Sequence, residues 1–362
     1  MTKILSIGTA NPAFRHRQED ILQFMQRVYA LDAVEDRKLK FLYHQSGISS
    51  RYSVIPDYSS AICDWKFYPA YESLEPFPAL ELRMSWYKKY AAALSIDAIR
   101  KCLGKAKLRA AEITHLITVS CTGMSAPGLD LEVMELLELH RATHRSSINF
   151  MGCYAAIHGL KQADAICRSS PGARVLIVCT ELCTLHFQKV ATPDNIASSL
   201  LFGDGSAAVL LSGDDFGKGV GIRGFYGEVI PKGKRDMSWE LSSSGFLMTL
   251  SGYIPELIST DFLPLLNRAL EEFGIGQKAV GHWCIHPGGK RILQAVEKSL
   301  QLPDTALASG YEILKQFGNM SSPTILFVLQ HMLEKGARGN IVAAAFGPGL
   351  TMETCLLEAG TV

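Results

Sequence analysis

One pattern of strands, turns and helices occurs twice along this chain, and it limits the possible folds more than any other feature. In each copy an apolar segment typical of a buried strand precedes a helical segment, a short turn that opens another helix, and a second apolar strand. The first copy spans residues 113–179, and the second spans residues 280–345. This repetition predicts two similar halves that bury their apolar faces against each other.

Strand-like and helix-like segments alternate in both halves. Continuous apolar, β-branched runs favour buried strands, and apolar residues at intervals of three or four positions favour helices. The expected strands are 113–120, 173–179, 207–211, 280–285 and 340–345. The expected helices are 129–139, 155–167, 290–300 and 323–335. The alternation predicts an α/β fold in which helices cover a central sheet.

The length of the chain agrees with two halves, because 362 residues fit two units of about 150 to 200 residues each. A polar segment rich in Gly and Asp, residues 212–219, is typical of a connection between such units. We therefore expect an N-terminal half at 1–215 that carries a nucleophilic cysteine and a C-terminal half at 216–362 that carries its partners.

Charge and apolar patterning exclude several classes of function. The formal net charge is +1 and no run of five basic residues occurs, so we expect no nucleic-acid partner. The N-terminus lacks the apolar core of a signal peptide, and no run of about 18 uncharged apolar residues is present, so we expect a cytoplasmic protein without a membrane partner. The nine cysteines lie mostly in apolar segments, which favours buried thiols over disulfides.

Three side chains stand at the junctions between strands and helices in the two copies. Cys153 follows Gly152 at the start of an expected helix, where unpaired backbone N–H groups favour a thiolate. His286 ends an expected strand and precedes a tight Pro-Gly-Gly turn, and Asn319 takes the place in the second copy that Cys153 takes in the first. Taken singly, a packed cysteine, a core histidine and a helix-capping asparagine would explain them.

A two-fold arrangement of the copies would bring Cys153, His286 and Asn319 together. An imidazole stabilises a thiolate as an ion pair and donates to a developing oxyanion, and an amide donates at any pH. Cysteine, histidine and asparagine without an acidic residue fit carbon–carbon bond formation by decarboxylative condensation, in which loss of CO2 generates the carbanion. The sequence therefore predicts Cys153 as the nucleophile, with no cofactor.

A second set of potential ligands has the spacing C-x3-C-x2-H, formed by Cys179, Cys183 and His186. Such a spacing can indicate zinc, but a structural zinc site needs a fourth ligand and a closed local loop. Cys179 ends an expected buried strand, and nothing nearby in the sequence completes the set. We therefore expect no metal site.

Five motifs occur in a fixed order over nearly the whole chain and resemble those of the type III polyketide synthases, the chalcone synthase-like enzymes. They are GCYAA at 152–156, LFGDGSAA at 201–208, HPGG at 286–289, FGNMSSP at 317–323 and FGPGLT at 346–351. The resemblance implies a homodimer with a thiolase fold, five αβαβα layers built from two duplicated halves. It also implies iterative condensation of malonyl-CoA onto an acyl-CoA starter carried by Cys153, with His286 and Asn319 at the thioester carbonyl and Phe202 as gatekeeper.

The resemblance also assigns positions around the cavity and the CoA entrance. The cavity positions carry Cys121, Thr122, Ala126, Cys183, His186, Trp239, Met248 and Ser321. The CoA-binding positions carry Lys38, Lys40, Gly288 and Gly289. Phe41 and Gln45 replace two of the three basic residues of the plant enzymes at the entrance. Trp239 replaces a plant glycine and Cys121 is shared with bacterial tetrahydroxynaphthalene synthases, so the chain is similar to the bacterial type.

Two other interpretations are compatible with Cys153, His286 and Asn319. A ketoacyl-ACP synthase III-like enzyme would use them for one condensation with an acyl carrier protein, although the HPGG and FGPGL segments resemble the polyketide group. A non-catalytic thiolase-fold binding protein would have no need to keep all three together with Phe202. The polyketide interpretation predicts an alkylpyrone, an alkylresorcinol or a polyhydroxynaphthalene as the type of product, and it leaves the starter open.

Overall fold

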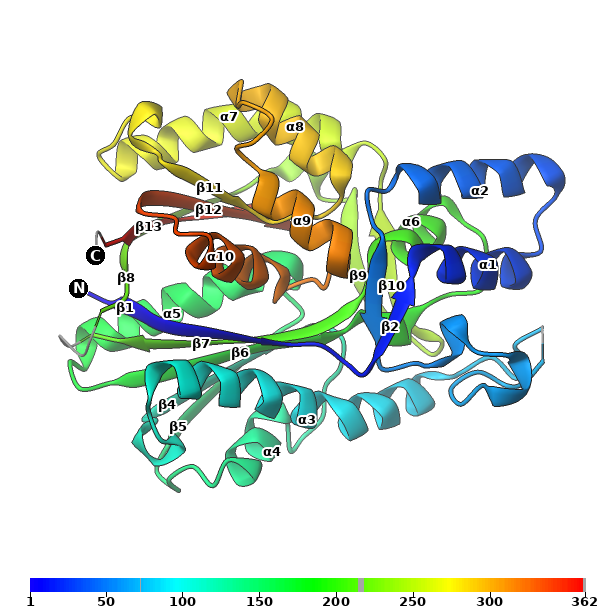
Figure 1. Cartoon of the computed structure of the whole chain (residues 1–362), viewed down its shortest axis with the longest axis horizontal. Helices are drawn as coiled ribbons and strands as arrows, with labels where there is room; N and C mark the ends of the chain where they lie inside the picture. Colours follow the sequence, from blue (N-terminus) through cyan, green and yellow to red (C-terminus); the bar gives the residue numbers. More distant parts are fainter. Residues whose placement is uncertain (72, 214–217, 361–362) are drawn as a thin grey trace.

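The chain folds into five alternating layers of helix and sheet, which Figure 1 shows from one side. This computed structural model describes residues 1–71, 73–213 and 218–360. A nine-stranded sheet in the order β11-β12-β13-β8-β1-β7-β6-β4-β5 runs through the molecule, and its two ends lie on opposite sides of a central helical layer. The predicted α/β fold with five layers is confirmed.

Each half of the sheet is assembled in the same order, which is how the repeat in the sequence is expressed in the structure. Outward from the middle of the sheet, the first strand of a half is followed by its last strand and then by its earlier ones. Antiparallel pairing of β1 with β8 joins the halves. The N-terminal half contributes β1 (Lys3–Ala10), β7 (Asp204–Ser212), β6 (Arg174–Leu182), β4 (His115–Ser120) and β5 (His144–Asn149). The C-terminal half contributes β8 (Val220–Val229), β13 (Thr351–Ala359), β12 (Gly339–Gly347) and β11 (His282–Ile285).

Helices form the layers between and outside the two halves of the sheet. The central layer contains α5 (Ala155–Ser169) and α10 (Thr324–Glu334), which both contact strands of the two halves. The outer layer of the N-terminal half contains α3 (Leu80–Ala106) and α4 (Leu129–Leu136). The outer layer of the C-terminal half contains α7 (Ile254–Glu272) and α8 (Lys290–Leu300). The helix α9 (Ala308–Phe317) packs between α8 and α10.

Side chains alternate across the sheet, so each strand contributes to two separate apolar clusters. On β6, Val175 and Ile177 face the central layer, whereas Leu176 and Val178 face the outer layer with α3. On β12, residues 341, 343 and 345 likewise face the central layer, and 342, 344 and 346 face α7 and α8. Burial of both faces explains why these strands are continuous apolar runs in the sequence.

A group of smaller elements packs against one end of the layers, on the right in Figure 1, and surrounds a cavity. It consists of α1 (Gln18–Tyr29), α2 (Ala33–Gln45), α6 (Pro193–Leu201), the hairpin of β2 (Phe14–Arg17) and β3 (Ser50–Ser53), and the hairpin of β9 (Met237–Ser242) and β10 (Gly245–Leu250). These elements lie outside the repeat, so the repeat alone could not predict them.

The expected strands and helices are all present, with differences of a few residues at their ends. The strand expected at 113–120 begins at His115, and the helix expected at 129–139 ends at Leu136. The expected connection at 212–219 falls partly on residues 214–217, which lie outside the described residues, and the division into halves at 215 stays a prediction. Among the described residues, no helix is both long enough and apolar enough to span a membrane.

Candidate active site

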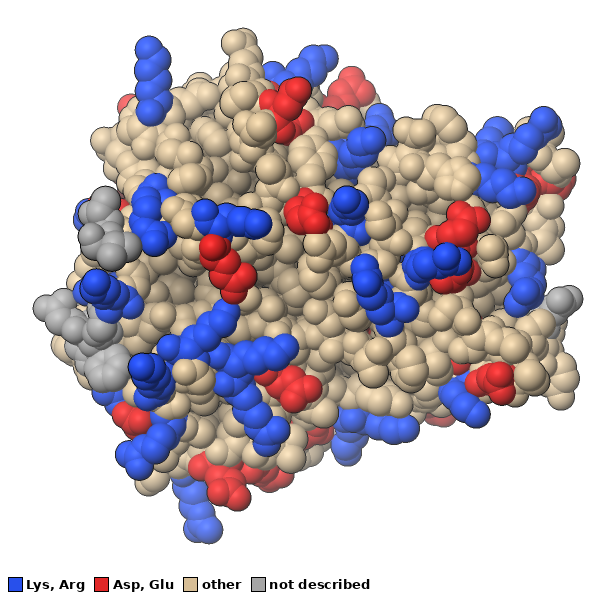
Figure 2. Space-filling model, in the orientation of Figure 1, with Lys and Arg blue, Asp and Glu red and all other residues tan. Residues whose placement is uncertain are grey.

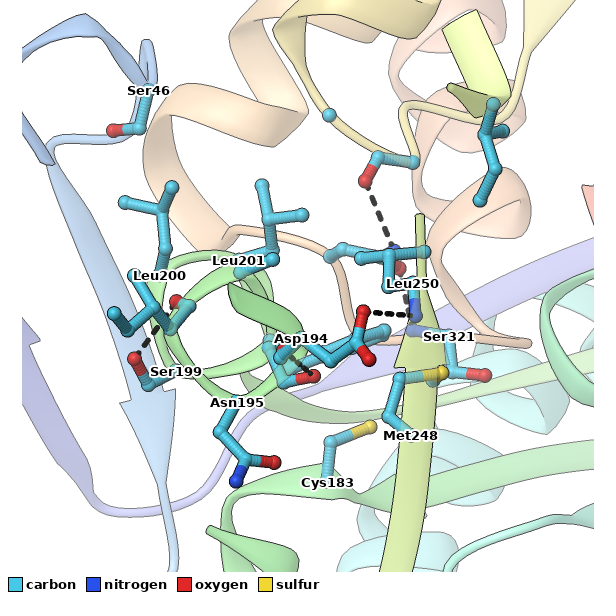
Figure 3. Close-up of a pocket in the computed structure, with 18 of the residues that line it drawn as sticks. Ser46, Cys183, Asp194, Asn195, Ser199, Leu200, Leu201, Met248, Leu250 and Ser321 are labelled. Atoms are coloured by element: carbon cyan, nitrogen blue, oxygen red, sulfur yellow. Dashed lines mark hydrogen bonds between the residues drawn. The ribbon is translucent and has the colours of Figure 1, made fainter. Parts of the chain in front are cut away.

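A cavity of about 1250 Å3 lies where strand ends of both halves meet α6, α2 and the β9–β10 hairpin. Cys153, His286 and Asn319 all line it, as the two-fold arrangement of the copies predicted. Figure 3 shows part of its wall, where Cys183, Met248 and Ser321 lie close to one another across from the residues of α6.

Cys153 lies in a single 3-10 turn, Gly152–Tyr154, directly before α5. Gly152 has a φ of +77°, and a Cβ atom there would lie 2.5 Å from Cδ of Pro348 in the loop after β12. A side chain at position 152 would therefore strain the backbone and collide with that loop. The glycine thus allows the C-terminal half to press against the turn that holds the nucleophile, and Cys153 is 8% exposed.

Asn319 follows α9 and is held by hydrogen bonds at both ends of its amide. Its Oδ1 accepts from the backbone N of Ser321 at 2.8 Å, and its Nδ2 donates to the carbonyl of Gly288 at 3.3 Å. The same Nδ2 lies 4.0 Å from Sγ of Cys153. Because the carbonyl end is already occupied, the amide turns its N–H groups towards the sulfur.

His286 directly follows β11 and is 1% exposed. Its backbone N donates to the carbonyl of Ala344 at 2.8 Å, which fixes the main chain beside β12. Neither ring nitrogen has a hydrogen-bond partner among the described residues. Burial lowers the pKa of His286 to about 3, so the ring is neutral, with one N–H donor and one free acceptor nitrogen.

The side chain of Cys153, the predicted nucleophile, is a thiol in this structure. Burial raises the pKa of Cys153 to about 11, because removal from water penalises the thiolate more than nearby donors stabilise it. The thiol donates to Oγ of Ser321 at 3.5 Å. The start of a helix was expected to favour a thiolate at Cys153, and in this resting structure desolvation outweighs that effect.

Beside the nucleophile lies a network of hydrogen bonds that sequence reasoning missed, centred on Glu181 at the end of β6. Its Oε2 accepts from Oγ1 of Thr122 at 2.8 Å and from the backbone N of Cys121 at 2.9 Å, and its Oε1 accepts from Oγ of Ser322 at 2.6 Å. Burial raises the pKa of the Glu181 carboxyl. A charged residue inside the apolar strand 174–182 was the signal in the sequence.

Ser321 connects this network with the nucleophile. Its Oγ lies 3.5 Å from Sγ of Cys121 and 3.5 Å from Sγ of Cys153. Its φ is +59°, a left-handed conformation that is uncommon for a residue with a side chain. Its backbone N–H donates to Oδ1 of Asn319, so the strained backbone also fixes the Asn319 amide.

An aromatic wall closes the cavity beyond Cys121. Nε1 of Trp239 donates to the carbonyl of Cys121 at 2.5 Å. Nε2 of His186 donates to the carbonyl of Thr122 at 2.7 Å, and Nδ1 accepts from the backbone N of Phe246 at 3.1 Å. The rings of His186 and Phe246 stack with centroids 4.2 Å apart. The rings of Trp239, His186 and Phe246 therefore fill the space into which the cavity would otherwise extend beyond Cys121.

The same hydrogen bonds bear on whether the C-x3-C-x2-H segment could bind a metal ion. Both ring nitrogens of His186 are engaged, and burial lowers the pKa of this ring to about 3. Cys183 faces the cavity with Phe202, whereas Cys179 lies in the central apolar cluster. Within the described residues, no group of three His, Cys, Asp or Glu side chains is arranged to hold a metal ion.

Phe202 packs on Cys153 and Cys183 at the end of α6. Its backbone forms an isolated bridge with Asn319, and its carbonyl accepts from Nη1 of the buried Arg51 at 2.5 Å. The ring thus lies over the nucleophile on a backbone that also carries the amide. Sequence reasoning did not single out Arg51 as the residue that ties these parts together.

Two of the expected site residues do not line the cavity. Ala126 is exposed, because the chain leaves the cavity wall after Thr122 and runs along the surface towards α4, and its assignment to the cavity stays a prediction. Lys40 pairs with Asp36 at 2.9 Å on α2 and is not part of the cavity lining, so its assignment to the CoA entrance also stays a prediction. Lys38 lines the mouth, as do Gly288 and Gly289.

Comparison with protein families identifies the chain. The description "Chalcone and stilbene synthases, N-terminal domain" matches residues 1–215, and "Chalcone and stilbene synthases, C-terminal domain" matches residues 223–361. The chain therefore belongs to the chalcone and stilbene synthases. Within this family it is an enzyme of the type III polyketide synthase class.

Curated relatives and a solved structure agree with this assignment. "Alpha-pyrone synthesis polyketide synthase-like Pks18" of Mycobacterium tuberculosis is 27% identical over 98% of this chain and 90% of its own length. "1,3,6,8-tetrahydroxynaphthalene synthase" of Streptomyces peucetius subsp. caesius is 28% identical over 99% of this chain and 93% of its own length. "Probable polyketide synthase 1" of Dictyostelium discoideum is 28% identical, and the chain spans 11% of its length. The structure of PKS-I from the brown alga Ectocarpus siliculosus superimposes with a TM-score of 0.93 at 28% identity, over 99% of this chain and 98% of that one.

Proposed function

We propose that this enzyme loads an acyl group from an acyl-CoA starter onto Cys153 and extends it by repeated decarboxylative condensation with malonyl-CoA. The observation that carries the proposal is the polar environment of the sulfur. Asn319 directs Nδ2 towards it at 4.0 Å, and His286 lines the same cavity as a neutral ring whose nitrogens no described residue occupies. Neutral donors in a desolvated site suit reactions in which a carbonyl oxygen gains negative charge.

Loading is a thioester exchange. The sulfur of Cys153 bonds to the acyl carbon, and the bond from that carbon to the sulfur of CoA breaks. Because burial keeps the thiol protonated, a base must take its proton as the bond forms. The free nitrogen of His286 accepts this proton and returns it to the departing CoA sulfur, while Asn319 donates to the carbonyl oxygen.

Chain extension uses the same two side chains, His286 and Asn319, and needs no proton from the Cys153 thiol. Malonyl-CoA loses CO2, and the electron pair of the broken C–C bond becomes the enolate of acetyl-CoA. Asn319 and the N–H of His286 stabilise the enolate oxygen. The enolate carbon then attacks the acyl carbon on Cys153, and the C–S bond breaks with its electron pair going to the Cys153 sulfur, which takes up one proton from solvent. A CoA-bound ketoacyl chain two carbons longer is released for the next round. Since decarboxylation supplies the carbanion, the proposed chemistry needs no cofactor.

We assign the product to the cyclised polyketides, of the alkylpyrone, alkylresorcinol or polyhydroxynaphthalene type. The names of the two similar proteins, an alpha-pyrone synthesis enzyme and a tetrahydroxynaphthalene synthase, support this range. The cavity of about 1250 Å3 offers room for several condensed units, and the wall of Trp239, His186 and Phe246 directs growth towards α6 and Met248.

The proposal includes a homodimer in the cytoplasm. The strand β5 lies at the edge of the nine-stranded sheet with mostly exposed side chains, and the exposed Met124 and Ala126 follow the cavity wall on the surface. An edge strand of this kind is suited to pairing with a second copy. All nine cysteines are free thiols, which fits a reducing compartment. Light scattering after gel filtration should give about twice the mass of one chain.

The test of the function is incubation of the purified enzyme with malonyl-CoA, alone and with acyl-CoA starters of increasing length. Release of CoA and formation of polyketide products, followed by liquid chromatography and mass spectrometry, are expected without any carrier protein. Mass spectrometry of the protein should find the acyl group on Cys153. An enzyme that neither releases CoA nor becomes acylated under any of these conditions would refute the proposal.

A further inference from the structure

The helix α2 has two apolar faces, although it packs against the protein with only one of them. Leu39 and Tyr43 are buried on the inner face. Val34, Phe41 and Leu42 are 52%, 64% and 42% exposed on the outer side. Phe41 and Leu42 follow Val34 by seven and eight positions, which places all three within one apolar stripe of a helix. Exposed phenylalanine and leucine side by side on a helix that also carries charged residues indicate a contact surface.

This apolar face borders the mouth of the catalytic cavity. Phe41 and Leu42 line the cavity together with Lys38 and Gln45 of the same helix. The lining at this mouth also includes Lys290 and Arg291 at the start of α8, where Lys290 lies against Gly47 just after α2, and Arg235 before β9. Any thioester that reaches Cys153 through this mouth therefore passes both apolar and basic side chains.

The charges on α2 are poorly suited to the phosphates of CoA. Lys38 pairs with Glu35 at 2.6 Å, and Lys40 pairs with Asp36 at 2.9 Å. Figure 2 accordingly shows basic and acidic side chains next to one another over the corner where Figure 1 places α1 and α2. Arg235 and Arg291 in the same lining are exposed, and within residues 1–71, 73–213 and 218–360 no carboxylate is paired with them.

We infer that the surface formed by Val34, Phe41 and Leu42, together with the exposed Arg235 and Arg291 of the same cavity lining, docks an acidic acyl carrier protein. This inference rests on the proposed function, since it names a second source of the starter for the same site. CoA and a carrier protein present the same phosphopantetheine thioester, but the nucleotide of CoA is replaced by a protein surface in the carrier. A protein surface covers a larger apolar area than the adenine of CoA can, and an acidic one matches the free cations.

The chemical step balances in the same way as loading from CoA. The acyl carbon leaves the sulfur of the carrier's phosphopantetheine and bonds to Sγ of Cys153. The proton of the Cys153 thiol passes to the phosphopantetheine sulfur, so a free carrier thiol and an acylated enzyme result. No oxidant or further co-reactant is required.

The experiment compares one acyl group presented by two donors. A purified acidic acyl carrier protein charged with a C12 acyl chain and the matching C12 acyl-CoA are each mixed with the enzyme, and acylation of Cys153 is timed by mass spectrometry. Both donors are expected to load the enzyme. The rate from the carrier protein should fall as salt is raised, because charge complementarity steers its approach.

The double variant Phe41→Ser/Leu42→Ser removes the apolar contacts without adding charge. The ratio of the loading rate from the carrier protein to that from acyl-CoA should fall at least about tenfold, the size expected for loss of central apolar contacts. The matched control is Leu136→Ser on α4, which removes an equally exposed leucine, 56% accessible and outside the cavity lining. It should leave the ratio unchanged.

The outcomes separate the two proposals. If neither donor acylates Cys153, the proposed function itself fails. If acyl-CoA loads and the carrier protein does not, or if the double variant slows both donors equally, the inference is overturned while the function stands. It is also overturned if the double variant instead halves the mass in solution or abolishes binding to phosphatidylglycerol vesicles, because the face would then belong to a second copy or to a lipid surface.

Discussion

Two buried histidines, His186 and His286, line the same cavity. Both rings are neutral, but they differ in their hydrogen bonds and ring contacts. His186 uses both ring nitrogens in hydrogen bonds and stacks on Phe246, whereas His286 has no side-chain partner among the described residues. Burial lowers the pKa of both to about 3. A shifted pKa alone therefore does not distinguish a histidine with a structural role from one that can act on a ligand. The distinguishing feature is the free hydrogen-bonding capacity that His286 presents in the cavity that Cys153 also lines.

The same contrast extends to the regions around them. At the wall region, Glu181 accepts from Thr122, Ser322 and the backbone of Cys121, so its polar groups are satisfied within the protein. At the nucleophile, the contacts are long: 3.5 Å from Cys153 to Ser321 and 4.0 Å to Asn319. Unpaired buried polar groups cost stability, so a fold that keeps them at one end of a cavity reserves them for a ligand.

The largest effect is expected at the nucleophile. Cys153→Ala should lower product formation by about a thousandfold or more, because the covalent acyl carrier is lost. Malonyl-CoA decarboxylation should continue at a measurable rate, since Asn319 and His286 act on the enolate without the thiol. Release of CO2 from labelled malonyl-CoA measures this. Equal loss of both reactions would show that the nucleophile and its helpers cannot be separated.

The comparison of the histidines is tested by two matched truncations. His286→Ala should lower decarboxylation about 100- to 1000-fold, the usual effect of losing an oxyanion donor. His186→Ala should lower it far less, but it should destabilise the protein by about 2 kcal/mol more than His286→Ala, because it leaves buried partners unpaired. Steady-state kinetics and urea unfolding of both variants measure the two quantities. If His186→Ala proved to be the more damaging variant for catalysis, the roles would have to be exchanged.

The sequence predicted that the three candidate catalytic residues line one cavity, but not what surrounds them, and the repeat explains why. Cys153, His286 and Asn319 lie on the repeated framework, so their convergence followed from the symmetry of the two copies. Lys40 lies outside the repeat on α2, and Ala126 lies in the loop after β4, where only side-chain direction decides whether a residue reaches the cavity. The amino-acid sequence pattern alone does not specify the direction of these side chains.

Contacts between residues far apart in the chain likewise could not be predicted from the sequence. Glu181 was recognisable only as a charge in an apolar strand, and its partners come from residues about 60 positions earlier and 141 positions later. The pairing of Lys38 with Glu35 and the neutral resting state of Cys153 depend on local geometry and burial. Burial of this kind arises only when the layers pack together. The electrostatics of a helix N-terminus alone therefore predicted a thiolate at Cys153, whereas burial keeps it a thiol.

Both histidines should make the protein sensitive to acid. Their folded pKa of about 3 lies below the ordinary value of 6.5, so the unfolded chain binds more protons between these values. Stability contributed by the neutral rings is present above about pH 6.5 and is lost as pH falls towards 3, by about 1.4 kcal/mol per pH unit for each ring. Urea unfolding at pH 7.0 and pH 5.0 measures the slope. His286→Ala should make it shallower, and an unchanged slope in that variant would contradict the burial of a neutral ring at 286.

The smallest expected effect concerns the wall rather than the nucleophile. Trp239→Ala removes the indole that donates to the carbonyl of Cys121 and packs against His186, so the cavity should extend beyond Cys121. The ratio of kcat/KM for a long acyl-CoA starter to that for a short one should rise about fivefold, since extra room in an apolar pocket discriminates only modestly between chain lengths. The matched control is Leu247→Ala on the same hairpin, because Leu247 is exposed and does not line the cavity. If Trp239→Ala left the preference unchanged, the aromatic wall would not limit the starter, and the boundary would have to be sought among the residues of α6.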